Sequence, residues 1–294
     1  MGEIRRSRTQ RPDERVVHVT PRDRAILRAI GKMKRASLKQ VRRLFFGDDR
    51  TAARRMAALF ASGYVEVRVA ALHEPNLLSL TSKARALLIA TATAEEDDLH
   101  LGGPLRADYR HLIAINDVRV DLVLACRSRT DVRLVLFLAD HDLRRAAGKS
   151  VPPYVPDALA RILVGESEPR AERGVVLEVD RGFESPRYIC QSKIRILLAL
   201  WQARASCWGL ANWRPLLLAP RKRLRTLARP ACEAGAAELL LLGDLGALSP
   251  DSVLASYATA GEVARAEDIA AVSWTSSLLD AAPAPMPLPQ GGAQ

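Results

Sequence analysis

Arginines in the first part of the chain recur at the spacing of one helical turn and could bind a polyanion. Arg50 and Arg54 are four residues apart, so that a helix would place them on one face, with Thr51 and Arg55 beside them. Guanidinium groups form paired hydrogen bonds with phosphates and with guanine edges. These residue types at this spacing therefore predict a helix that binds DNA.

The residues between these arginines have the pattern of a helix that packs one face on a domain. Ala52, Met56, Leu59 and Phe60 fall at i, i+4, i+7 and i+8. Asp48 or Asp49 can cap the start of the helix, and Gly63 is the residue type that commonly ends one. We therefore predict a DNA-recognition helix over residues 48–63.

Two helices are predicted before this one and a hairpin after it. Thr20-Pro21 is a start signal for a helix that ends near Lys34, and Ser37 can cap the second helix. The alternating residues 64–69 and the apolar residues 77–80 predict two strands, and a closing helix is predicted over 82–91.

Three helices followed by a hairpin are the order of a winged helix-turn-helix domain, whose third helix enters the major groove of double-stranded DNA. We place this domain at residues 20–92. Contacts to DNA phosphates are expected from Lys39, Arg42, Arg43 and Arg68. A winged helix used for protein contacts is the alternative.

The positive charge of the chain is confined to its first part. Residues 1–60 contain 17 Lys and Arg against 6 Asp and Glu, which accounts for the whole net charge of +11. The remaining residues contain 27 basic and 27 acidic side chains. This asymmetry favours a localised nucleic-acid site over a generally basic surface, although a solvated basic face would give the same count. Residues 1–19 are predicted to form a flexible basic arm.

Other classes of protein are excluded by composition. The four cysteines are too scattered for a disulfide framework, and no cysteine or histidine spacing fits a zinc site. The first residues lack the apolar run of a signal peptide, and no stretch of about 18 apolar residues could span a membrane. We expect a cytoplasmic protein without a membrane segment or a small-molecule cofactor.

The second part of the chain has a different pattern. Residues 93–107 are predicted to be a polar linker, residues 108–280 a second domain and residues 281–294 a disordered tail. In the second domain we expect a helix over 108–128, strands over 132–138, 156–164 and 174–180, a helix over 186–205, a strand over 214–219, a helix near 222–235 and a last strand over 238–242. A loop of roughly fifteen residues separates the first two strands, and residues 250–277 are expected to be partly helical. This αβββαβ order predicts a mixed sheet flanked by helices, and an α+β fold for the whole chain.

That order, with Pro156-Asp157 on one strand and Glu178-Val179-Asp180 on the next, resembles the PD-(D/E)xK nuclease fold. The resemblance implies that Asp157 and Glu178 hold Mg²⁺, which would activate water against a phosphodiester. Asp180 stands where that fold has its lysine. Lys193, on the following helix, is the candidate for the missing cation, and Asp117 or Asp121 is the candidate for a further acid.

Two functions are compatible with this resemblance. One is a Mg²⁺-dependent deoxyribonuclease that uses Asp157, Glu178, Asp180 and Lys193. The other is a catalytically silent nuclease-like domain that serves for dimerisation or for contacts to the DNA backbone. The missing lysine favours the silent domain.

The chain as a whole resembles the replication-relaxation family, bacterial proteins associated with plasmids and other mobile elements. The most specific matching residues are His111 followed by Asn116-Asp117, then Pro156-Asp157 and Glu178-Val-Asp-Arg-Gly182. The resemblance covers roughly residues 20–220 and implies a role in plasmid replication or DNA relaxation. Transcriptional regulation fits the same order of domains. We expect double-stranded DNA as the partner and a homodimer as the assembly.

Overall fold

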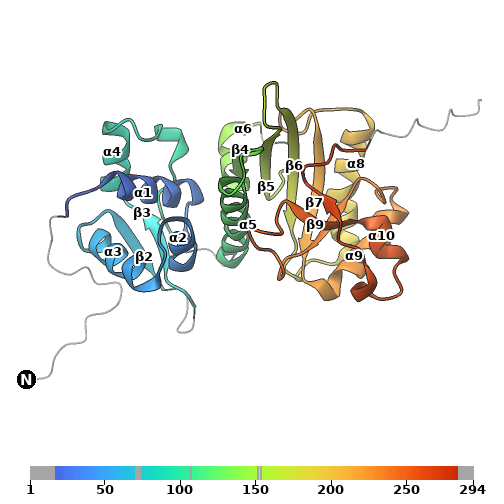
Figure 1. Ribbon diagram of the computed structural model, residues 1–294, viewed down its shortest axis with the longest axis horizontal. Coiled ribbons are helices and arrows are strands. Elements are labelled where there is room, and N and C mark those ends of the chain that lie inside the picture. The colour runs from blue at the N-terminus through green and yellow to red at the C-terminus, as the bar shows by residue number, and fades with distance from the viewer. Residues whose placement is uncertain (1–16, 70–73, 106–107, 151, 153, 284–294) are drawn as a thin grey trace, which may run out of the picture. The chain divides into compact units, whose positions relative to one another are not determined.

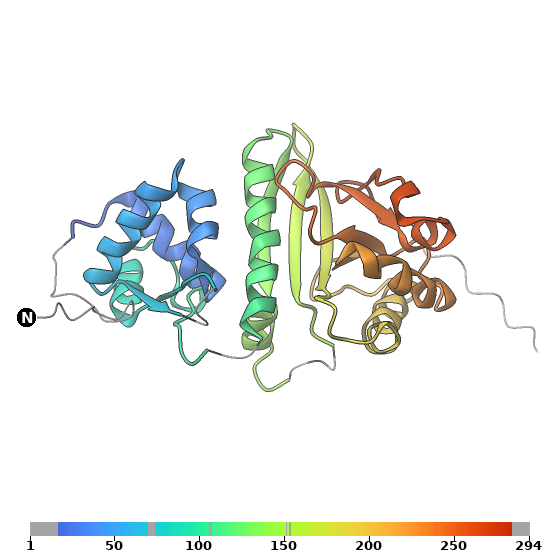
Figure 2. The same cartoon turned by 90° about the horizontal axis from the view of Figure 1, so that it is seen from below.

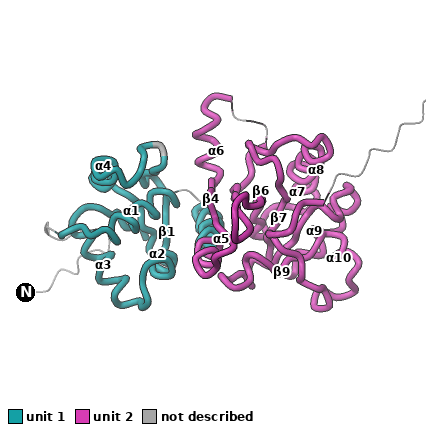
Figure 3. Tube along the Cα trace, turned by 45° about the horizontal axis from the view of Figure 1, so that its top comes forward, with its two compact units in different colours: residues 1–120 teal, residues 121–294 magenta. Residues whose placement is uncertain are grey.

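The computed structural model describes residues 17–69, 74–105, 108–150, 152 and 154–283 (Figure 1). The predicted basic arm lies outside these residues apart from 17–19, and so does the predicted tail apart from 281–283. The chain forms two compact units, residues 1–120 and 121–294 (Figure 3). Their division falls inside the long helix α5 (Tyr109–Arg127), whereas the sequence suggested a boundary at 93–107.

Unit 1 contains the predicted helices and hairpin in the predicted order. The helices are α1 (Pro21–Met33), α2 (Leu38–Phe45), α3 (Asp49–Ala61) and α4 (Ser82–Ala90), and the hairpin strands are β2 (Val65–Arg68) and β3 (Leu77–Leu80). The side chains of Thr20, Ser37 and Asp48 accept backbone hydrogen bonds at the starts of α1, α2 and α3, as their positions in the sequence indicated. The short strand β1 (Ala36–Ser37), which was not predicted, pairs with β3 and completes a three-stranded sheet.

Residues 93–107 are not an extended polar linker throughout. The short 3₁₀ helix η1 (Glu96–Asp98) leads into Leu99, which is only 2% exposed and packs over Gly31. His100 N donates to Gly31 O at 3.0 Å, and Leu101 bridges to Leu80 of β3. Leu99 and Leu101 therefore hold this segment against the rest of unit 1, although the segment as a whole is polar in composition.

The buried Arg35 holds the next part of the same segment. Its guanidinium donates to the carbonyl oxygens of Gly102, Gly103 and Pro104, at 3.3, 2.7 and 2.7 Å. These are contacts between residues almost 70 positions apart, and only the folded chain brings them together. Arg35 therefore stabilises unit 1, and its guanidinium is not presented to solvent.

Unit 2 is built on a seven-stranded mixed sheet, which confirms the predicted α+β class. The strand order is β10-β9-β8-β7-β6-β5-β4 (Figure 1). The strands are β4 (Val132–Ala139), β5 (Ala158–Val164), β6 (Ala171–Val179), β7 (Trp213–Ala219), β8 (Leu241–Asp244), β9 (Ala255–Thr259) and β10 (Ser276–Ser277). The first three strands are antiparallel, β7 and β8 run parallel to β6, and the last two strands are again antiparallel.

The helices and strands of unit 2 differ from the prediction in three places. The loop expected between the first two strands contains α6 (Asp140–Ala147), whose start is capped by Asp142. The predicted helix over 186–205 consists of α7 (Pro186–Ile189), a π-helical turn η2 (Cys190–Ile194) and α8 (Arg195–Gln202). The last predicted strand begins at Leu241 and not at Glu238, and the chain then adds β9, α10 (Ala260–Arg265), the 3₁₀ helix η3 (Ile269–Ala271) and β10.

The main core of unit 2 lies between the sheet and the helices that follow β6. Helix α9 (Arg221–Glu233) places Leu224, Leu227 and Ala228 against Leu217 of β7 and Leu242 of β8. Figure 2 shows α9 and α10, in orange and red, together on one side of the sheet. Among the described residues, no helix has both the length and the apolar character needed to cross a membrane.

Candidate functional site

A carboxylate lies within the buried part of an interior strand of the sheet. Residues 174–179 at the end of β6 are all buried, as expected for an interior strand covered on both faces. Glu178 belongs to this run and is only 2% exposed. Because burying a charge is costly unless it is paired, Glu178 requires specific partners.

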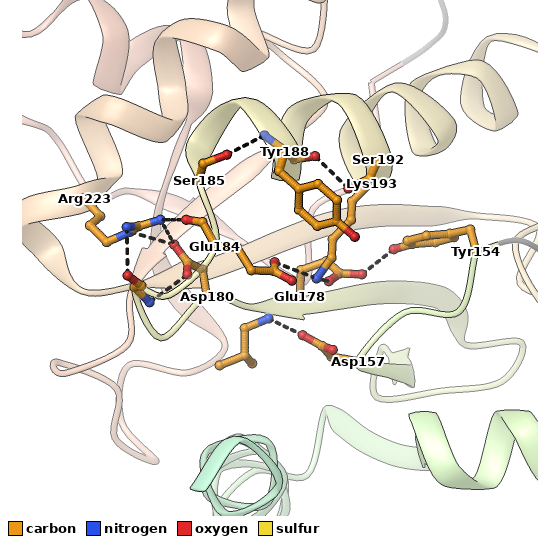
Figure 4. A network of polar contacts seen from close by, with 12 residues as sticks. Tyr154, Asp157, Glu178, Asp180, Glu184, Ser185, Tyr188, Ser192, Lys193 and Arg223 are labelled. Atoms are coloured by element: carbon orange, nitrogen blue, oxygen red, sulfur yellow. Dashed lines mark hydrogen bonds and ion pairs between the residues drawn. The ribbon is translucent and has the colours of Figure 1, made fainter. Parts of the chain in front are cut away.

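Two side chains contact the two oxygens of Glu178 (Figure 4). Tyr154 Oη donates to Oε1 at 2.5 Å, and Lys193 Nζ lies 2.8 Å from Oε2. Lys193 Nζ is also 3.3 Å from Oε2 of the half-exposed Glu184. The buried carboxylate is therefore held by one neutral donor and one cation.

Asp157 lies beside this cluster, at the start of β5. The antiparallel register pairs Ala158 with Leu177, and Asp157 Oδ2 accepts a hydrogen bond from Val179 N at 2.8 Å. Asp157 and Glu178 are thus neighbours across adjacent strands, as the resemblance to the nuclease fold implied. Figure 4 shows Asp157 next to the Glu178–Lys193 pair.

Lys193 reaches the strand from the π-helical turn. The residues of η2 hydrogen-bond over a wider turn than those of α7 and α8, and such turns change the direction in which a side chain leaves a helix. The side chains of Tyr188 and Lys193 both extend from this helical stretch toward the strand that carries Glu178 (Figure 4). The cation that pairs with the strand residue Glu178 is therefore supplied by the following helix.

The charges in this cluster are strongly coupled. Burial, followed by the charge of Asp157, raises the pKa of Glu178 to about 8, although Lys193 opposes the shift. Burial alone would lower the pKa of Lys193, but the nearby Glu178 and Asp157 raise it above its usual value. Burial and the charge of Glu178 raise the pKa of Tyr154 well above its usual value, so Tyr154 remains a hydrogen-bond donor at neutral pH.

The donor set of this cluster fits a divalent cation. Asp157 and Glu178 are hard oxygen ligands, and their mutual repulsion, which contributes to the raised pKa of Glu178, is what a bound cation would relieve. They are the residues that would hold Mg²⁺, which when bound could polarise a phosphodiester and activate water. Both Glu178 oxygens already have partners, so Lys193 or Tyr154 would have to share the carboxylate with the metal.

Asp180 is separated from this cluster by its own partners. Its Oδ2 accepts from Arg223 Nε at 2.8 Å, and its Oδ1 accepts from Gly182 N at 2.7 Å. Because β6 ends at Val179, the strand alternation that would place Asp180 on the same face as Glu178 does not continue. Asp180 shapes the loop after the strand instead of joining Asp157 and Glu178.

The predicted recognition helix exposes two of its three arginines. Arg50 and Arg54 are exposed on α3, whose opposite face buries Ala52, Met56 and Leu59. These two arginines are one turn apart, so they lie on the same side of the helix. Asp48 caps this helix by accepting from Thr51 N at 2.7 Å, which fixes the first turn that carries Arg50.

Arg55 has a different role from the one predicted. Its guanidinium forms an ion pair with the fully buried carboxylate of Asp23 on α1 and donates to His18 O at 2.9 Å. Although burial opposes the charge of Asp23, hydrogen bonds from Arg55 and Thr20 hold its pKa below the usual range. Arg55 therefore ties α3 to α1 and is not directed at a ligand.

The remaining predicted phosphate contacts differ in their surroundings. Lys39 is exposed at the start of α2, and Arg68 is exposed on β2, 3.9 Å from Glu66. Arg42 forms an ion pair of 2.8 Å with Asp49 across the turn between α2 and α3, and Arg43 is half-buried. The loop that follows β2 includes residues 70–73, which lie outside the described part of the chain.

The family model for replication-relaxation proteins matches residues 27–214, which include both α3 and the Asp157–Glu178 cluster. The chain belongs to the replication-relaxation family. This confirms the resemblance seen in the sequence. No curated protein and no solved structure gives a match.

The motif that was most specific to the replication-relaxation resemblance has a structural role in unit 1. Asn116 is fully buried, and its Nδ2 donates to Met33 O at 3.1 Å and to Arg35 O at 2.8 Å, at the end of α1. Asp117 Oδ1 accepts from Gln40 Nε2 at 2.9 Å. Asp117, one of the two candidates for a further acid, is therefore a partner of α2. Asp121, the other candidate, is buried in unit 2.

Two side chains of the replication-relaxation chain that contact these acids, Tyr154 at Glu178 and Arg223 at Asp180, were not predicted as their partners. Tyr154 lies in a segment that reads as a loop, and nothing in its sequence neighbourhood indicates a buried phenol. Arg223 belongs to a basic run at the start of α9, where the helix dipole disfavours positive charge. That unfavourable position was a signal for an anionic partner, and the partner is Asp180.

Proposed function

We propose that this chain is a double-stranded DNA-binding protein of a plasmid or other mobile element. In this proposal unit 1 contains a winged helix-turn-helix domain, and α3 reads the major groove. The biological role would be that of a replication or relaxation accessory protein or of a transcriptional regulator. The observation that carries the proposal is the exposure of Arg50 and Arg54 on one face of α3, opposite a buried face.

Three further observations support this function. The order of three helices and an antiparallel hairpin is that of winged helix-turn-helix domains. The net charge of +11 belongs entirely to the first 60 residues. The chain belongs to the replication-relaxation family, and the name of that family fits a protein that acts on DNA.

Base contacts are proposed for Arg50, Thr51 and Arg54, at the exposed start of α3. Phosphate contacts are proposed for Lys39, Arg42, Arg43 and Arg68. Arg55 leaves this set because its guanidinium is engaged by Asp23. We also propose that two copies pair, as many helix-turn-helix proteins do to read two half-sites, which sedimentation of the full chain would test.

Selection of bound duplexes from a random pool, followed by a salt titration on the selected site, tests this function. If about five phosphates are contacted, the logarithm of the affinity should fall with the logarithm of salt concentration at a slope of about −4 to −5. Arg54→Ala should weaken binding to the selected site by roughly 1–3 kcal/mol and relax the preference at one base pair. Arg28, exposed on α1 and outside the proposed set, provides the matched control Arg28→Ala. A slope near zero would remove the DNA assignment.

For unit 2 we propose a PD-(D/E)xK nuclease-like domain that serves for assembly or for contacts to the DNA backbone. The antiparallel β4-β5-β6 strands followed by the parallel β7 support this fold. A Mg²⁺-dependent deoxyribonuclease is the second candidate. It is favoured by one observation, the presence of Lys193 at 2.8 Å from Glu178 and beside Asp157.

Cleavage assays on the selected duplex, with Mg²⁺ and with a chelator, separate these two functions of unit 2. The nuclease function predicts cleavage that requires the metal and is lost in both Asp157→Ala and Lys193→Met. The assembly function predicts no metal-dependent cleavage and unchanged duplex binding in Asp157→Ala. Asp180→Asn is a useful comparison, since the Asp180 carboxylate is engaged by Arg223 outside the cluster.

A further inference from the structure

Two exposed aromatic side chains lie close together in the sequence, directly after the strand that carries Glu178. Phe183 is 81% exposed and Tyr188 is 54% exposed. In the part of the chain that the structure describes, Val69 and Ile89 are the other exposed large hydrophobic residues, at 38% and 40%, and neither is aromatic. Single exposed apolar residues are common on proteins, whereas apolar groups gathered on one surface mark interaction sites, in which aromatic rings supply much of the contact energy.

The loop that presents Phe183 is held in place from both sides. Arg223 Nη1 donates to Gly182 O at 3.1 Å and its Nη2 donates to Glu184 O at 2.6 Å, so that the residues before and after Phe183 are both fixed. Gly182 has a φ of +97°, a conformation that side-chain-bearing residues rarely adopt. The backbone is therefore ordered while the Phe183 ring remains in solvent.

Tyr188 is presented by the first turn of α7. Ser185 caps this turn by accepting from Tyr188 N at 3.1 Å, and Pro186 occupies its first position. The Tyr188 ring leaves the helix on the same side as Lys193 (Figure 4). Both aromatic residues thus have a fixed backbone and an exposed ring, which lowers the entropy lost when a ligand binds.

The charged residues around these rings are mostly cations. The Arg181 guanidinium lies 5.2 Å from the centre of the Phe183 ring, and Arg187 is exposed next to Tyr188. Glu184 follows Phe183 in the sequence, but its carboxylate is paired with Lys193. The surface combines flat rings with positive charge.

We propose that residues 181–188 bind an unpaired DNA strand, with bases stacked on Phe183 and Tyr188 and phosphates contacted by Arg181 and Arg187. Stacking on aromatic rings within a basic surface is how proteins hold single strands without regard to sequence. A duplex hides its base faces inside its own stack, so it cannot use these rings. This surface belongs to unit 2, and it does not depend on duplex binding by α3.

The test is binding of the full chain to a fluorescent oligothymidine of about 15 nucleotides, a length that spans one such surface. Phe183→Ala should weaken binding by roughly tenfold or more, and Phe183→Ala/Tyr188→Ala should weaken it further. Phe183→Trp should retain binding, whereas Phe183→Leu, which is apolar but has no flat ring, should lose it. Ile89→Ala, which removes an exposed apolar residue of unit 1, is the matched control and should bind as the wild type.

Other occupants of this surface give different results. If Phe183→Ala/Tyr188→Ala binds the oligonucleotide as the wild type does, the proposal is overturned. Loss of self-association in that same variant would then show that the surface binds a second copy of this chain. Binding by Phe183→Leu at wild-type strength would also overturn it, since apolar contact alone would then suffice. Arg54→Ala should weaken duplex binding and leave oligothymidine binding unchanged, so failure of one function can be told from failure of the other.

Discussion

Lys193 Nζ lies 2.8 Å from Glu178 Oε2, so a helix residue pairs with a carboxylate that is buried in β6, an interior strand of the sheet. Two positions after Glu178, Asp180 forms a second pair with Arg223 of α9. The two acids of the Glu-Val-Asp sequence therefore belong to two separate ion pairs. The first pair lies beside Asp157, while the second fixes the loop that carries Phe183.

The pH dependence of stability should reveal the buried Glu178. Its pKa is about 8 in the folded chain and near the usual value of 4.5 when unfolded, so the folded state binds its proton more tightly. The stability that protonation of Glu178 contributes is complete below the pKa of the unfolded state and is lost as the pH rises through the pKa of the folded state. We expect the free energy of unfolding of the wild type to fall relative to that of Glu178→Gln between about pH 5 and pH 8.

All four tryptophans lie in unit 2, so urea unfolding followed by tryptophan fluorescence reports on this unit. Parallel pH profiles for the two proteins would contradict the assignment.

Removing the cation should expose the repulsion between Glu178 and Asp157. Lys193→Met leaves the carboxylate buried without its charge partner, and breaking such pairs costs roughly 3 kcal/mol. The loss should be larger near pH 8 than near pH 5, because only the ionised carboxylate needs the cation. The double variant Glu178→Gln/Lys193→Met should recover most of the stability. Arg195→Met, on an exposed position two residues further along the helix, should have little effect.

Two adjacent arginines of α3 should give opposite results. Arg55→Ala leaves the buried Asp23 carboxylate without its ion pair and should lower the stability of unit 1 by roughly 2–3 kcal/mol. Arg54→Ala changes an exposed residue and should shift stability by no more than about 0.5 kcal/mol, while it weakens duplex binding. Unit 1 contains no tryptophan, so hydrogen exchange of the α1 and α3 amides is the suitable measurement. Similar protection in the two variants would show that the Asp23 pair contributes little.

The contacts of Arg223 predict that the order of the loop over residues 180–184 depends on its guanidinium group. Arg223→Lys keeps the charge but cannot reach Asp180, Gly182 and Glu184 together, because an ammonium lacks the fork of donors. We expect faster proteolysis after Arg181 in this variant, with α9 itself intact. Lys222→Ala, which alters an exposed neighbour, is the control. Wild-type resistance to proteolysis in Arg223→Lys would mean that other contacts order the loop.

Local patterns along the chain were enough to predict most of the elements. The caps at Thr20, Ser37 and Asp48 and the apolar spacing in α1 and α3 act over a few residues, and the structure places those helices within one or two residues of the prediction. The same holds for β4, β7 and α9. Helix α6 was missed because its eight residues, Asp-His-Asp-Leu-Arg-Arg-Ala-Ala, contain only one buried apolar position, Leu143, and so show no periodic face.

Sequence alone therefore determined most of the helices and strands of both units, the confinement of positive charge to the first 60 residues and the family to which the chain belongs. Only the tertiary structure decided which charged groups meet. The contacts Arg55–Asp23, Arg35–Gly103, Lys193–Glu178 and Arg223–Asp180 join residues 15 to 68 positions apart. The Coulomb interaction between two charges depends on their distance in space and not on their separation along the chain. An arginine in a basic run therefore looks the same in the sequence whether it faces a buried carboxylate or open solvent. The fold makes that choice, because burial removes the water that would otherwise replace a partner.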